Sequence, residues 1–457
     1  MKPTTSETKP EVMPLVAWPR IEGRAVDCLR SLLKSLAETQ YFSSEKLAEH
    51  GRIQLGVLAE YAAKHCQHFA NRLARAGIKP STLTLPGGLE KLDILRRRDI
   101  QSAGAALCCT VVPPRHMPLN KAETSGSTGE PVVVIRTALN RLFWMAMTMR
   151  EQNWNTRDFS RRMSSVRANI PKLAYSDTWG PPASLLRQTG RSQGIPITAD
   201  AAQQAEWIRQ FDPAYLMHYP NSLASLAAYV VQHEIKFPGL RQIRSIGETL
   251  SAHTKALAEN AFGVPVIDTY SSNEVGVIAL QCSASGLYHI MSENLIVEVL
   301  REDGSAAAEG EIGRVVITDL HNFATPLIRY DIGDYAELGG PCSCGRELPR
   351  LKRILGRERN LVRMPDGTTH WPLLGFAAFR DVAPLIQYQF VQHDLKTIEF
   401  RIVAERPLTA AEETALRGIA QEALGHKFNF KFVYYAEVIP RGRGGKFEEF
   451  ICLISDP

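Results

Sequence analysis

A run of small and hydroxylated residues, TSGSTGEPVVV, spans positions 124 to 134 and leads directly into β-branched residues. Glycine has no side chain to keep an anion away from the backbone, and serine and threonine hydroxyls donate short hydrogen bonds to phosphate oxygens. The run therefore predicts a loop that holds nucleotide phosphates. Its candidate phosphate contacts are Thr124, Ser125, Gly126, Ser127, Thr128 and Gly129.

This loop differs from the P-loop of ordinary nucleoside triphosphatases. A P-loop needs a lysine followed by serine or threonine, and then a helix. Here Glu130 and Pro131 stand at those positions, and residues 132 to 136 favour a strand. The common P-loop fold is therefore not expected. Taken alone, the segment also fits a polar surface loop between two strands.

Length and composition indicate an enzyme-sized globular chain. The 457 residues are 44% hydrophobic, which is enough for a sizeable core spread over more than one domain. The net charge of +5 arises from 53 basic and 48 acidic residues without a long basic block, so no nucleic-acid partner is expected. No apolar stretch has the length of a membrane span or the form of a signal peptide, so we expect a cytoplasmic protein without a membrane partner.

Hydrophobic periodicity divides the chain into a large and a small part. The first hundred residues predict helices, over 21 to 37 and 46 to 76. Strands and helices then alternate up to about position 356, as in α/β folds. We therefore predict a large multi-sheet α/β domain over 1 to 356 and a small, mobile α+β domain over 357 to 457. The predicted strands are 131 to 136, 265 to 270, 295 to 300 and 314 to 320 in the large part, and 385 to 393, 397 to 403, 430 to 438 and 447 to 453 around a helix at 410 to 424 in the small part.

Three further motifs carry groups suited to nucleotide chemistry. YSSNEVG at 270 to 276 follows a predicted strand, so Tyr270 and Glu274 are expected at its carboxyl end, where α/β sheets place ligands. In YDIGD, Asp334 has a carboxylate that can accept both ribose hydroxyls. PRGRGGK ends in Lys446, a single cation on the small part. Each motif alone is more often a turn or a solvated charge.

Together, TSGSTGEP, YSSNE, YDIGD, the Gly356-Arg357 pair and the late Gly-Lys pair resemble the adenylate-forming superfamily of acyl-CoA synthetases, and they occur in the order of that family. SIGETLS at 245 to 251, TPLIRYDIGD, and CSCGRELPRLKRILGR more narrowly resemble the branch that holds phenylacetate-CoA ligase, CapK and coenzyme F390 synthetase. The resemblance extends from about position 55 to the end of the chain.

The resemblance implies a reaction in two steps. A small-molecule carboxylic acid attacks the α-phosphate of ATP to give an acyl-adenylate, and CoA, or alternatively an amine or a carrier protein, takes the acyl group. Lys446, Glu274 and Thr128 would be catalytic, and Glu274 would also hold Mg²⁺. The small domain would act as a lid that swings between the two steps. Beside the phosphate loop, the implied nucleotide contacts are Gly247, Glu248, Tyr270, Ser271, Asn273, Asp334 and Arg357.

Three motifs depart from the family pattern, among them the hinge, where Glu358, Arg359 and Asn360 replace the acidic residue expected after the Gly356-Arg357 pair. Asn273 replaces the usual threonine before the glutamate, and Asp331 stands where a neutral or basic residue is expected, which adds a negative charge near the nucleotide. These departures leave a non-catalytic, nucleotide-binding descendant as an alternative of another class. The intact Glu274, Asp334 and Lys446 argue against it.

Cys282, His289, Cys342 and Cys344 form a candidate metal site. Three thiolates and one imidazole make the closed tetrahedral ligand set of structural zinc. The spacing alone is modest evidence, and four unconnected side chains are the alternative. The same four positions resemble a zinc site found in many members of the branch, so the resemblance implies Zn²⁺ here.

The acyl pocket is the least defined part of the prediction. Trp179, His218 and Tyr219 would suit a flat aromatic or heteroaromatic acid, although core aromatic residues are an equal alternative. The sequence leaves open which acid is bound, which acceptor is used and whether the chain forms a homodimer.

Overall fold

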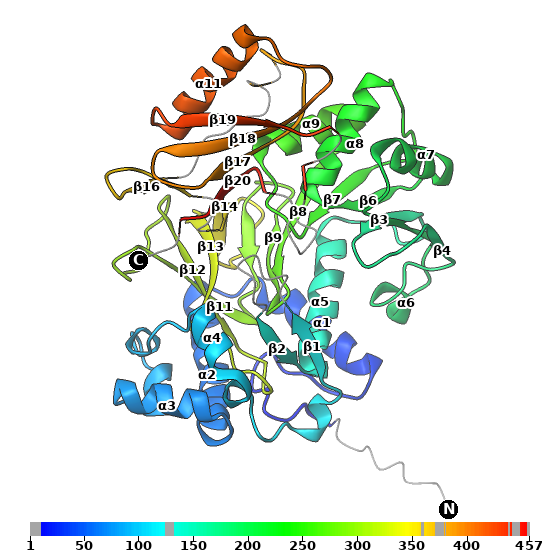
Figure 1. Cartoon of the computed structure of the whole chain (residues 1–457). Coiled ribbons are helices and arrows are strands. Elements are labelled where there is room, and N and C mark those ends of the chain that lie inside the picture. The colour runs from blue at the N-terminus through cyan, green and yellow to red at the C-terminus, as the bar shows by residue number, and fades with distance from the viewer. Residues whose placement is uncertain are drawn as a thin grey trace, which may run out of the picture.

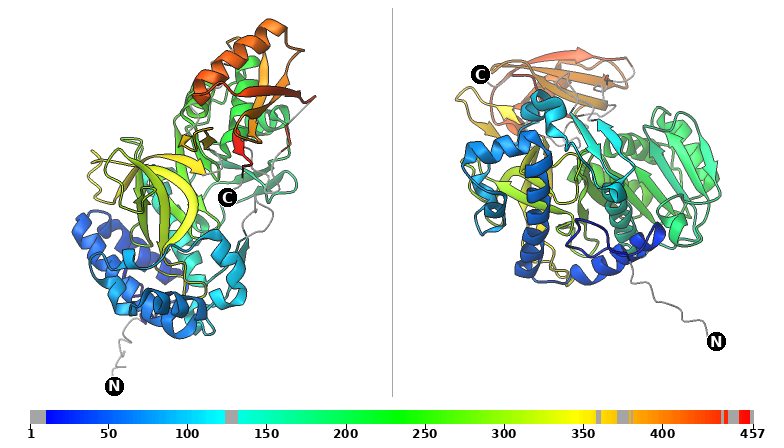
Figure 2. Two further views of the ribbon diagram at one scale, coloured as in Figure 1. Left: turned by 60° about the vertical axis from the view of Figure 1, so that its left-hand side comes forward. Right: turned by 90° about the horizontal axis from the view of Figure 1, so that it is seen from below.

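The computed structural model describes residues 11–123, 132–357, 361–370, 379, 381–436, 439–440 and 448–454. Its described part is an α/β fold, as predicted, with a 12-stranded sheet flanked by helices at one end and by a separate four-stranded sheet at the other (Figure 1). The left view in Figure 2 also places the N-terminal helices and the C-terminal unit at opposite ends of the molecule. Among the described residues, no helix combines the length and the apolar character needed to cross a membrane.

The N-terminal helices differ from the prediction in two places. The helix expected over 21 to 37 begins only at Val26, because Ile21 and Glu22 pair with the segment at Val12 and Met13, and Ala25 has a positive φ. The single helix expected over 46 to 76 is broken at Cys66, whose backbone is extended. Tertiary contacts stabilise the break: the thiol donates to the carbonyl of Leu107 at 3.2 Å, and the carbonyl of His65 accepts from the amide of Thr110 at 2.8 Å. The helices of this region are α1 (Val26–Thr39), α2 (Ser44–His65), α3 (Gln67–Ala76) and α4 (Arg97–Ala103), with 3-10 turns η1 (Pro80–Thr84), η2 (Leu89–Lys91), η3 (Gly104–Leu107) and η4 (Pro114–His116).

The large sheet has the strand order β11-β12-β13-β14-β10-β9-β8-β7-β6-β3-β5-β4. Five neighbouring strands are parallel, namely β3 (Met163–Arg167), β5 (Ser192–Pro196), β6 (Tyr215–His218), β7 (Gln242–Ile246) and β8 (Val266–Ser272). The others pair antiparallel: β4 (Ala174–Ser176), β9 (Gly276–Gln281), β10 (Tyr288–Ile290), β11 (Leu295–Leu300), β12 (Ile312–Asp319), β13 (Tyr330–Leu338) and β14 (Arg350–Arg357). A separate hairpin joins β1 (Asn120–Glu123) to β2 (Val133–Arg136).

Helices cover both faces of the parallel strands. Ile243 of β7 is fully buried in a core shared with α8 (Pro220–Gln232) and α9 (Ala252–Phe262). The next residue, Arg244, points to the other face and pairs with Glu151 of α5 (Ala138–Trp154). The parallel strands are therefore buried on both sides, as expected for an α/β sheet. Helices α6 (Ala183–Leu186) and α7 (Ala201–Phe211) complete this part.

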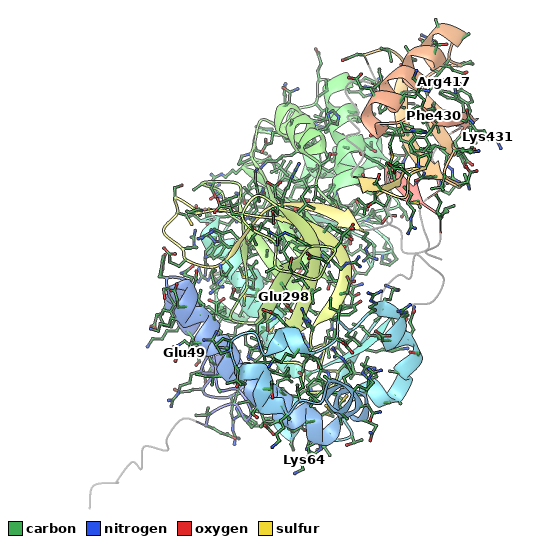
Figure 3. The ribbon with its side chains drawn as sticks, turned by 90° about the vertical axis from the view of Figure 1, so that its left-hand side faces the viewer. Glu49, Lys64, Glu298, Arg417, Phe430 and Lys431 are labelled. Atoms are coloured by element: carbon green, nitrogen blue, oxygen red, sulfur yellow. The ribbon has the colours of Figure 1, made fainter. Side chains whose placement is uncertain are left out.

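The C-terminal unit has its own sheet and its own core. The strands β17 (Leu385–Gln392), β18 (Thr397–Ala404), β19 (Asn429–Tyr434) and β20 (Phe450–Cys452) pair in the order β19-β18-β17-β20, next to α11 (Ala410–Leu424). Phe390 and Phe400 pack inside this core with their ring centroids 4.1 Å apart and their planes tilted by 33°. In Figure 3, Arg417 of α11 lies beside Phe430 of β19, whose carbonyl accepts its hydrogen bond at 3.2 Å. A short hairpin of β15 (Val362–Arg363) and β16 (Thr369–His370) precedes the unit.

Candidate functional site

Three sequence motifs meet at the carboxyl ends of β6, β7 and β8. These strands are parallel neighbours, with His218 opposite Ser245 and Ile246 opposite Thr269. Tyr219, Gly247 and Tyr270 therefore come to the same edge of the sheet, where α/β folds bind their ligands.

Gly247 and Glu248 bind the loop after β7 to the loop after β6. Gly247 has φ of +77°, and a Cβ there would lie 2.9 Å from the ring of Tyr219, so a larger residue would be strained and would collide with that ring. The carboxylate of Glu248 accepts hydrogen bonds from the backbone amide and the side-chain amide of Asn221, at 3.1 and 3.0 Å. Both predicted residues therefore shape this edge of the sheet.

Tyr270, Asp334 and Arg357 form a connected network. The hydroxyl of Tyr270 donates to one carboxylate oxygen of Asp334 at 2.8 Å, and Nε of Arg357 lies 3.5 Å from the other oxygen. The antiparallel register of β13 and β14 places Asp334 opposite Arg357. The structure thus brings together three predicted nucleotide contacts from three strands.

Burial and nearby charges raise the pKa of two members of the network, Tyr270 and Arg357. Burial and the nearby Asp334 carboxylate raise the pKa of Tyr270 well above its ordinary value, so the phenol remains a donor. Burial alone would lower the pKa of Arg357, but Asp334, Glu274 and Glu448 outweigh it and raise that pKa. Glu448 belongs to the C-terminal unit, so that unit contributes charge to this site.

Glu274 lies in the turn between β8 and β9 and is 3% exposed. Its carboxylate has a long contact of 3.5 Å from the hydroxyl of Tyr330. Ser271, near the end of β8, is half-buried. In the turn, the side-chain amide of Asn273 donates to the carbonyl of Glu123 at 3.3 Å. Asn273 thus connects this turn to the residue that precedes the phosphate loop.

The phosphate-loop residues Thr124, Ser125, Gly126, Ser127, Thr128 and Gly129, and the proposed catalytic Lys446, lie outside the described residues. On the two sides of the loop, β1 and β2 pair antiparallel with Glu123 opposite Val133. The strand predicted over 131 to 136 is confirmed from Val133 to Arg136, as β2.

The negative charge of Asp331, which the sequence places near the nucleotide, is paired within the fold. Its carboxylate pairs with Arg314 of β12 at 2.8 Å and accepts the amide of Gly333 at 2.9 Å. Asp331 and Asp334 therefore have different partners, although they lie three positions apart on one strand.

Two residues of this region were not predicted individually. Tyr330 is 1% exposed, and burial, followed by the charge of Glu274, raises its pKa above the ordinary value. Its position as the first residue of the YDIGD motif is the sequence signal that could have identified Tyr330 as a site residue. Arg136, at the end of β2, has its pKa lowered by burial, an effect that Asp319 and Glu274 partly offset. No sequence signal distinguishes Arg136 from other strand residues.

The three predicted acyl-pocket residues do not come together. His218 and Tyr219 follow each other at the carboxyl end of β6, whereas Trp179 packs against Phe159 and Tyr215 near the opposite end of that strand. The ring nitrogens of His218 lie 3.1 Å from the carbonyl of Tyr219 and 2.9 Å from the side-chain oxygen of Gln204. Tyr219, half-buried, is the member that faces the site edge.

The four predicted metal ligands do come together. Their ligand atoms all lie within 4.8 Å of one another. Cys342 Sγ is 3.8 Å from Cys282 Sγ and 3.3 Å from Cys344 Sγ, which is 3.2 Å from Nε2 of His289. In a tetrahedral zinc site with Zn–S bonds of about 2.3 Å, sulfur atoms lie roughly 3.8 Å apart. The arrangement fits such a donor set.

The surroundings of the cluster support it as a metal centre. Nδ1 of His289 lies 3.3 Å from the carbonyl of Leu348, which leaves Nε2 to face the thiols, and such an outer contact orients a metal-binding imidazole. Cys282 follows β9, His289 lies on β10, and Cys342 and Cys344 precede β14. The cluster therefore fixes the start of the strand that ends at Arg357.

Comparisons with known proteins place the chain among ligases. It is 38% identical to phenylacetate-coenzyme A ligase of Thermus thermophilus over 405 residues, which cover 85% of this chain and 86% of that protein. It is 26% identical to protein CapK of Staphylococcus aureus over 247 residues, which cover 52% of this chain and 53% of CapK, so it aligns with about half of that protein. No protein-family model matches the chain.

Solved structures show the same fold. A 2-hydroxyisobutyryl-CoA ligase in complex with 2-HIB-AMP superimposes with a TM-score of 0.70 at 19% identity, covering 90% of each chain. An anthranilate CoA ligase in complex with anthranoyl-AMP gives a TM-score of 0.51 at 16% identity, covering 74% of this chain and 67% of the other. At these identities the likeness establishes the architecture alone.

Proposed function

Because the chain belongs to the phenylacetate-coenzyme A ligase family, we propose that it activates a carboxylic acid with ATP and transfers the acyl group to CoA. The observation that carries this proposal is the network of Tyr270, Asp334 and Arg357 beside the buried Glu274, at the carboxyl ends of parallel strands. A carboxylate, a phenol and a guanidinium at such an edge suit a nucleotide.

The proposed roles follow from the chemistry of each side chain. Asp334 accepts the ribose hydroxyls, Arg357 binds ribose or phosphate, and Tyr270 lies beside the adenine with Ser271 and Asn273. Gly247 and Glu248 line the adenine side. The hydroxyls of residues 124 to 128, with Thr128 among the catalytic groups, hold the β- and γ-phosphates, and Lys446 bridges the carboxylate and the α-phosphate. These donors stabilise the negative charge that develops on the phosphate oxygens and on the leaving pyrophosphate.

Glu274 fits the role of a Mg²⁺ ligand. Among the described residues, the hydroxyl of Tyr330 is the one hydrogen-bond donor to its buried carboxylate, at 3.5 Å, so the carboxylate has lone pairs for a hard cation. The ion would supply charge neutralisation next to the phosphates.

The proposed domain boundary lies between residues 356 and 357, with the C-terminal unit acting as a mobile lid. The separate sheet and core of that unit support this division. Glu448 lies close enough to raise the pKa of Arg357, so a movement of the unit would change the charge around the nucleotide. In this way one site could serve two half-reactions in turn.

The preferred acid is expected to be small and aromatic or heteroaromatic. The rigid ring of Tyr219 at the site edge suits a planar acid, whereas a long alkyl chain needs a deep apolar tunnel. Pyrophosphate release should be measured over benzoates, phenylacetates, heteroaryl acids, short hydroxy acids and fatty acids. A preference for chains of about ten carbons or more would contradict the pocket assignment.

The same assay tests the function itself. Each acid is incubated with ATP and with CoA, hydroxylamine or candidate amines as acceptor. Acid-dependent pyrophosphate release followed by thioester formation supports the proposal. Transfer to amines but not to CoA would identify an amide-forming ligase, and the absence of acid-dependent pyrophosphate release with every acid would indicate a non-catalytic protein.

We propose that Cys282, His289, Cys342 and Cys344 bind one structural Zn²⁺ per chain. The double variant Cys342→Ser, Cys344→Ser should lose the metal and unfold at a lower temperature, because the ion joins β9 and β10 to the segment before β14. Metal analysis and thermal unfolding measure both effects. Cys452→Ser, outside the cluster, is the matched control. Full metal content in the double variant, or no zinc in protein prepared without chelators, would contradict the assignment.

A further inference from the structure

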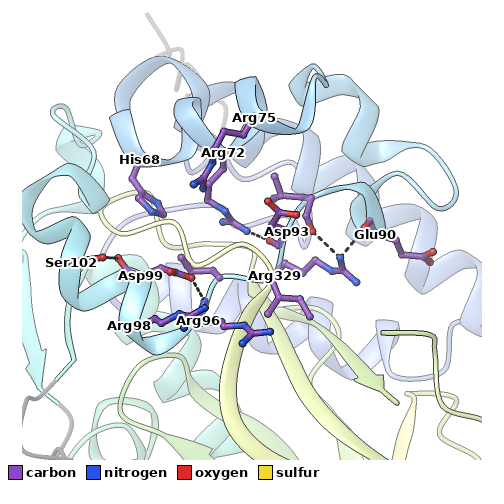
Figure 4. Close-up of a pocket in the computed structure, with 13 residues that line it drawn as sticks. His68, Arg72, Arg75, Glu90, Asp93, Arg96, Arg98, Asp99, Ser102 and Arg329 are labelled. Carbon is purple, nitrogen blue, oxygen red and sulfur yellow. Dashed lines mark hydrogen bonds between the residues drawn. The ribbon is translucent and has the colours of Figure 1, made fainter. Parts of the chain in front are cut away.

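A cavity of about 610 Å³ lies between the N-terminal helices and the large sheet (Figure 4). Helix α3 borders it on one side, and the segment from Glu90 to α4 borders it on the other, with Arg329 at its base. We call it the arginine pocket, because Arg72, Arg75, Arg96, Arg98 and Arg329 all line it.

The five arginines fall into two groups. Two of them are held by the fold: Arg72 donates to the carbonyl of Ile328 at 2.9 Å, and Arg329 donates to the carbonyl of Leu92 at 2.8 Å and pairs with Glu298. Within the described part of the chain, the guanidinium groups of Arg75, Arg96 and Arg98 form no ion pair and no hydrogen bond, and all three side chains are exposed to solvent. The pocket thus presents three uncommitted cations over a rigid base.

The acids of the lining leave these cations available. Asp99 accepts the backbone amide of Arg96 at 2.8 Å and so caps α4. Figure 4 shows the carboxylate of Glu90 turned away from the arginines. The remaining acid, Asp93, is exposed. Burial is the main cause that lowers the pKa of His68 on the pocket wall, and the charges of Arg72 and Arg75 lower it further.

The pocket adjoins the nucleotide site. The amide of Leu95 donates to the carbonyl of Arg329 at 2.7 Å, and the amide of Asp331 donates to the carbonyl of Leu95 at 2.9 Å. Arg329 and Asp331 flank Tyr330, whose hydroxyl contacts Glu274. Arg329, directly before β13, therefore lines the arginine pocket, and Tyr330, the first residue of β13, contacts the nucleotide site.

We propose that the arginine pocket binds the phosphate-bearing nucleotide end of CoA. This inference rests on the proposed function, which makes CoA the acceptor. The volume suits a nucleotide rather than a single inorganic anion. One guanidinium group can donate two hydrogen bonds to two oxygens of the same phosphate. The three guanidinium groups of Arg75, Arg96 and Arg98 match in number the 3′-phosphate and the two phosphates of the diphosphate of CoA. CoA carries its thiol on a long flexible arm, so its phosphates belong beside the adenylation site rather than in it.

The test separates CoA binding from adenylate formation. The double variant Arg96→Ala, Arg98→Ala should raise KM for CoA by about tenfold or more, because each substitution removes one charge-assisted contact to a phosphate. It should also abolish most of the preference for CoA over dephospho-CoA. The rate of adenylate trapping by hydroxylamine should change much less. Arg209→Ala, an exposed arginine on α7 that pairs with Glu206, is the matched control.

A second measurement does not depend on turnover. Binding of CoA should raise the pKa of His68, followed by NMR, because the phosphates offset the nearby guanidinium charges, and dephospho-CoA should raise it less. An unchanged KM for CoA in the double variant, an unchanged preference over dephospho-CoA, or a loss confined to KM for ATP would each overturn the inference. Absence of adenylate formation in the unmodified protein would instead overturn the proposed function.

Discussion

Lys446→Ala is expected to lower the rate of acyl-adenylate formation by at least about a hundredfold, which is the scale for losing one charge contact to a transition state. Thioester formation from a supplied adenylate should fall much less, because the lysine acts on the α-phosphate only while pyrophosphate leaves. Single-turnover pyrophosphate release and thioester formation from synthetic adenylate measure the two steps separately.

Lys431→Ala provides the control for the Lys446 variant. It removes the same charge from the same C-terminal unit, at an exposed position on β19 (Figure 3), and should leave both steps near their original rates. If Lys446→Ala slows the two half-reactions equally, the model in which the C-terminal unit exchanges between two positions is wrong for this protein.

Local sequence patterns predicted the C-terminal unit closely. The helix expected at 410 to 424 is α11 (Ala410–Leu424), and the strands expected at 385 to 393 and 397 to 403 are β17 (Leu385–Gln392) and β18 (Thr397–Ala404). Alternating apolar residues and a capping threonine act over a few positions, so they can be read from the sequence. The break at Cys66 was not predicted, because contacts with Leu107 and Thr110 stabilise it from more than 40 positions away.

In the candidate site, too, features set by local motifs were predicted, and contacts that depend on the register of distant strands were not. Motif order predicted that Tyr270, Asp334 and Arg357 belong together, and the four metal ligands also meet. Sequence reasoning did not foresee that Arg314 would pair with Asp331, because that contact depends on the register of β12 against β13. An aromatic residue type likewise does not show which end of a strand it packs against, so Trp179 was grouped with His218 although the two lie at different ends of β6.

Asp334→Asn should lower kcat/KM for ATP by about thirtyfold to a hundredfold. A carboxylate accepts two ribose hydroxyls as charge-assisted hydrogen bonds, each contributing about 1.5 to 3 kcal/mol, and an amide oxygen accepts them more weakly. The substitution also removes the charge opposite Arg357. It replaces one of the two carboxylate oxygens by an NH2 group, and the Tyr270 hydroxyl donates to one of those oxygens. Pyrophosphate exchange at varied ATP concentration measures the effect.

Asp331→Asn is the matched control for this variant, because it removes the same charge three positions away on the same strand. Its carboxylate pairs with Arg314 and accepts the amide of Gly333, so its loss should reduce stability without a specific effect on KM for ATP. Equal losses of kcat/KM for ATP in both variants would mean that the charge of this strand matters rather than the Asp334 contact. An unchanged kcat/KM for ATP in Asp334→Asn would contradict the assignment of the ribose to Asp334. A selective loss at Asp334 would assign the ribose to the carboxylate that Tyr270 and Arg357 hold in place.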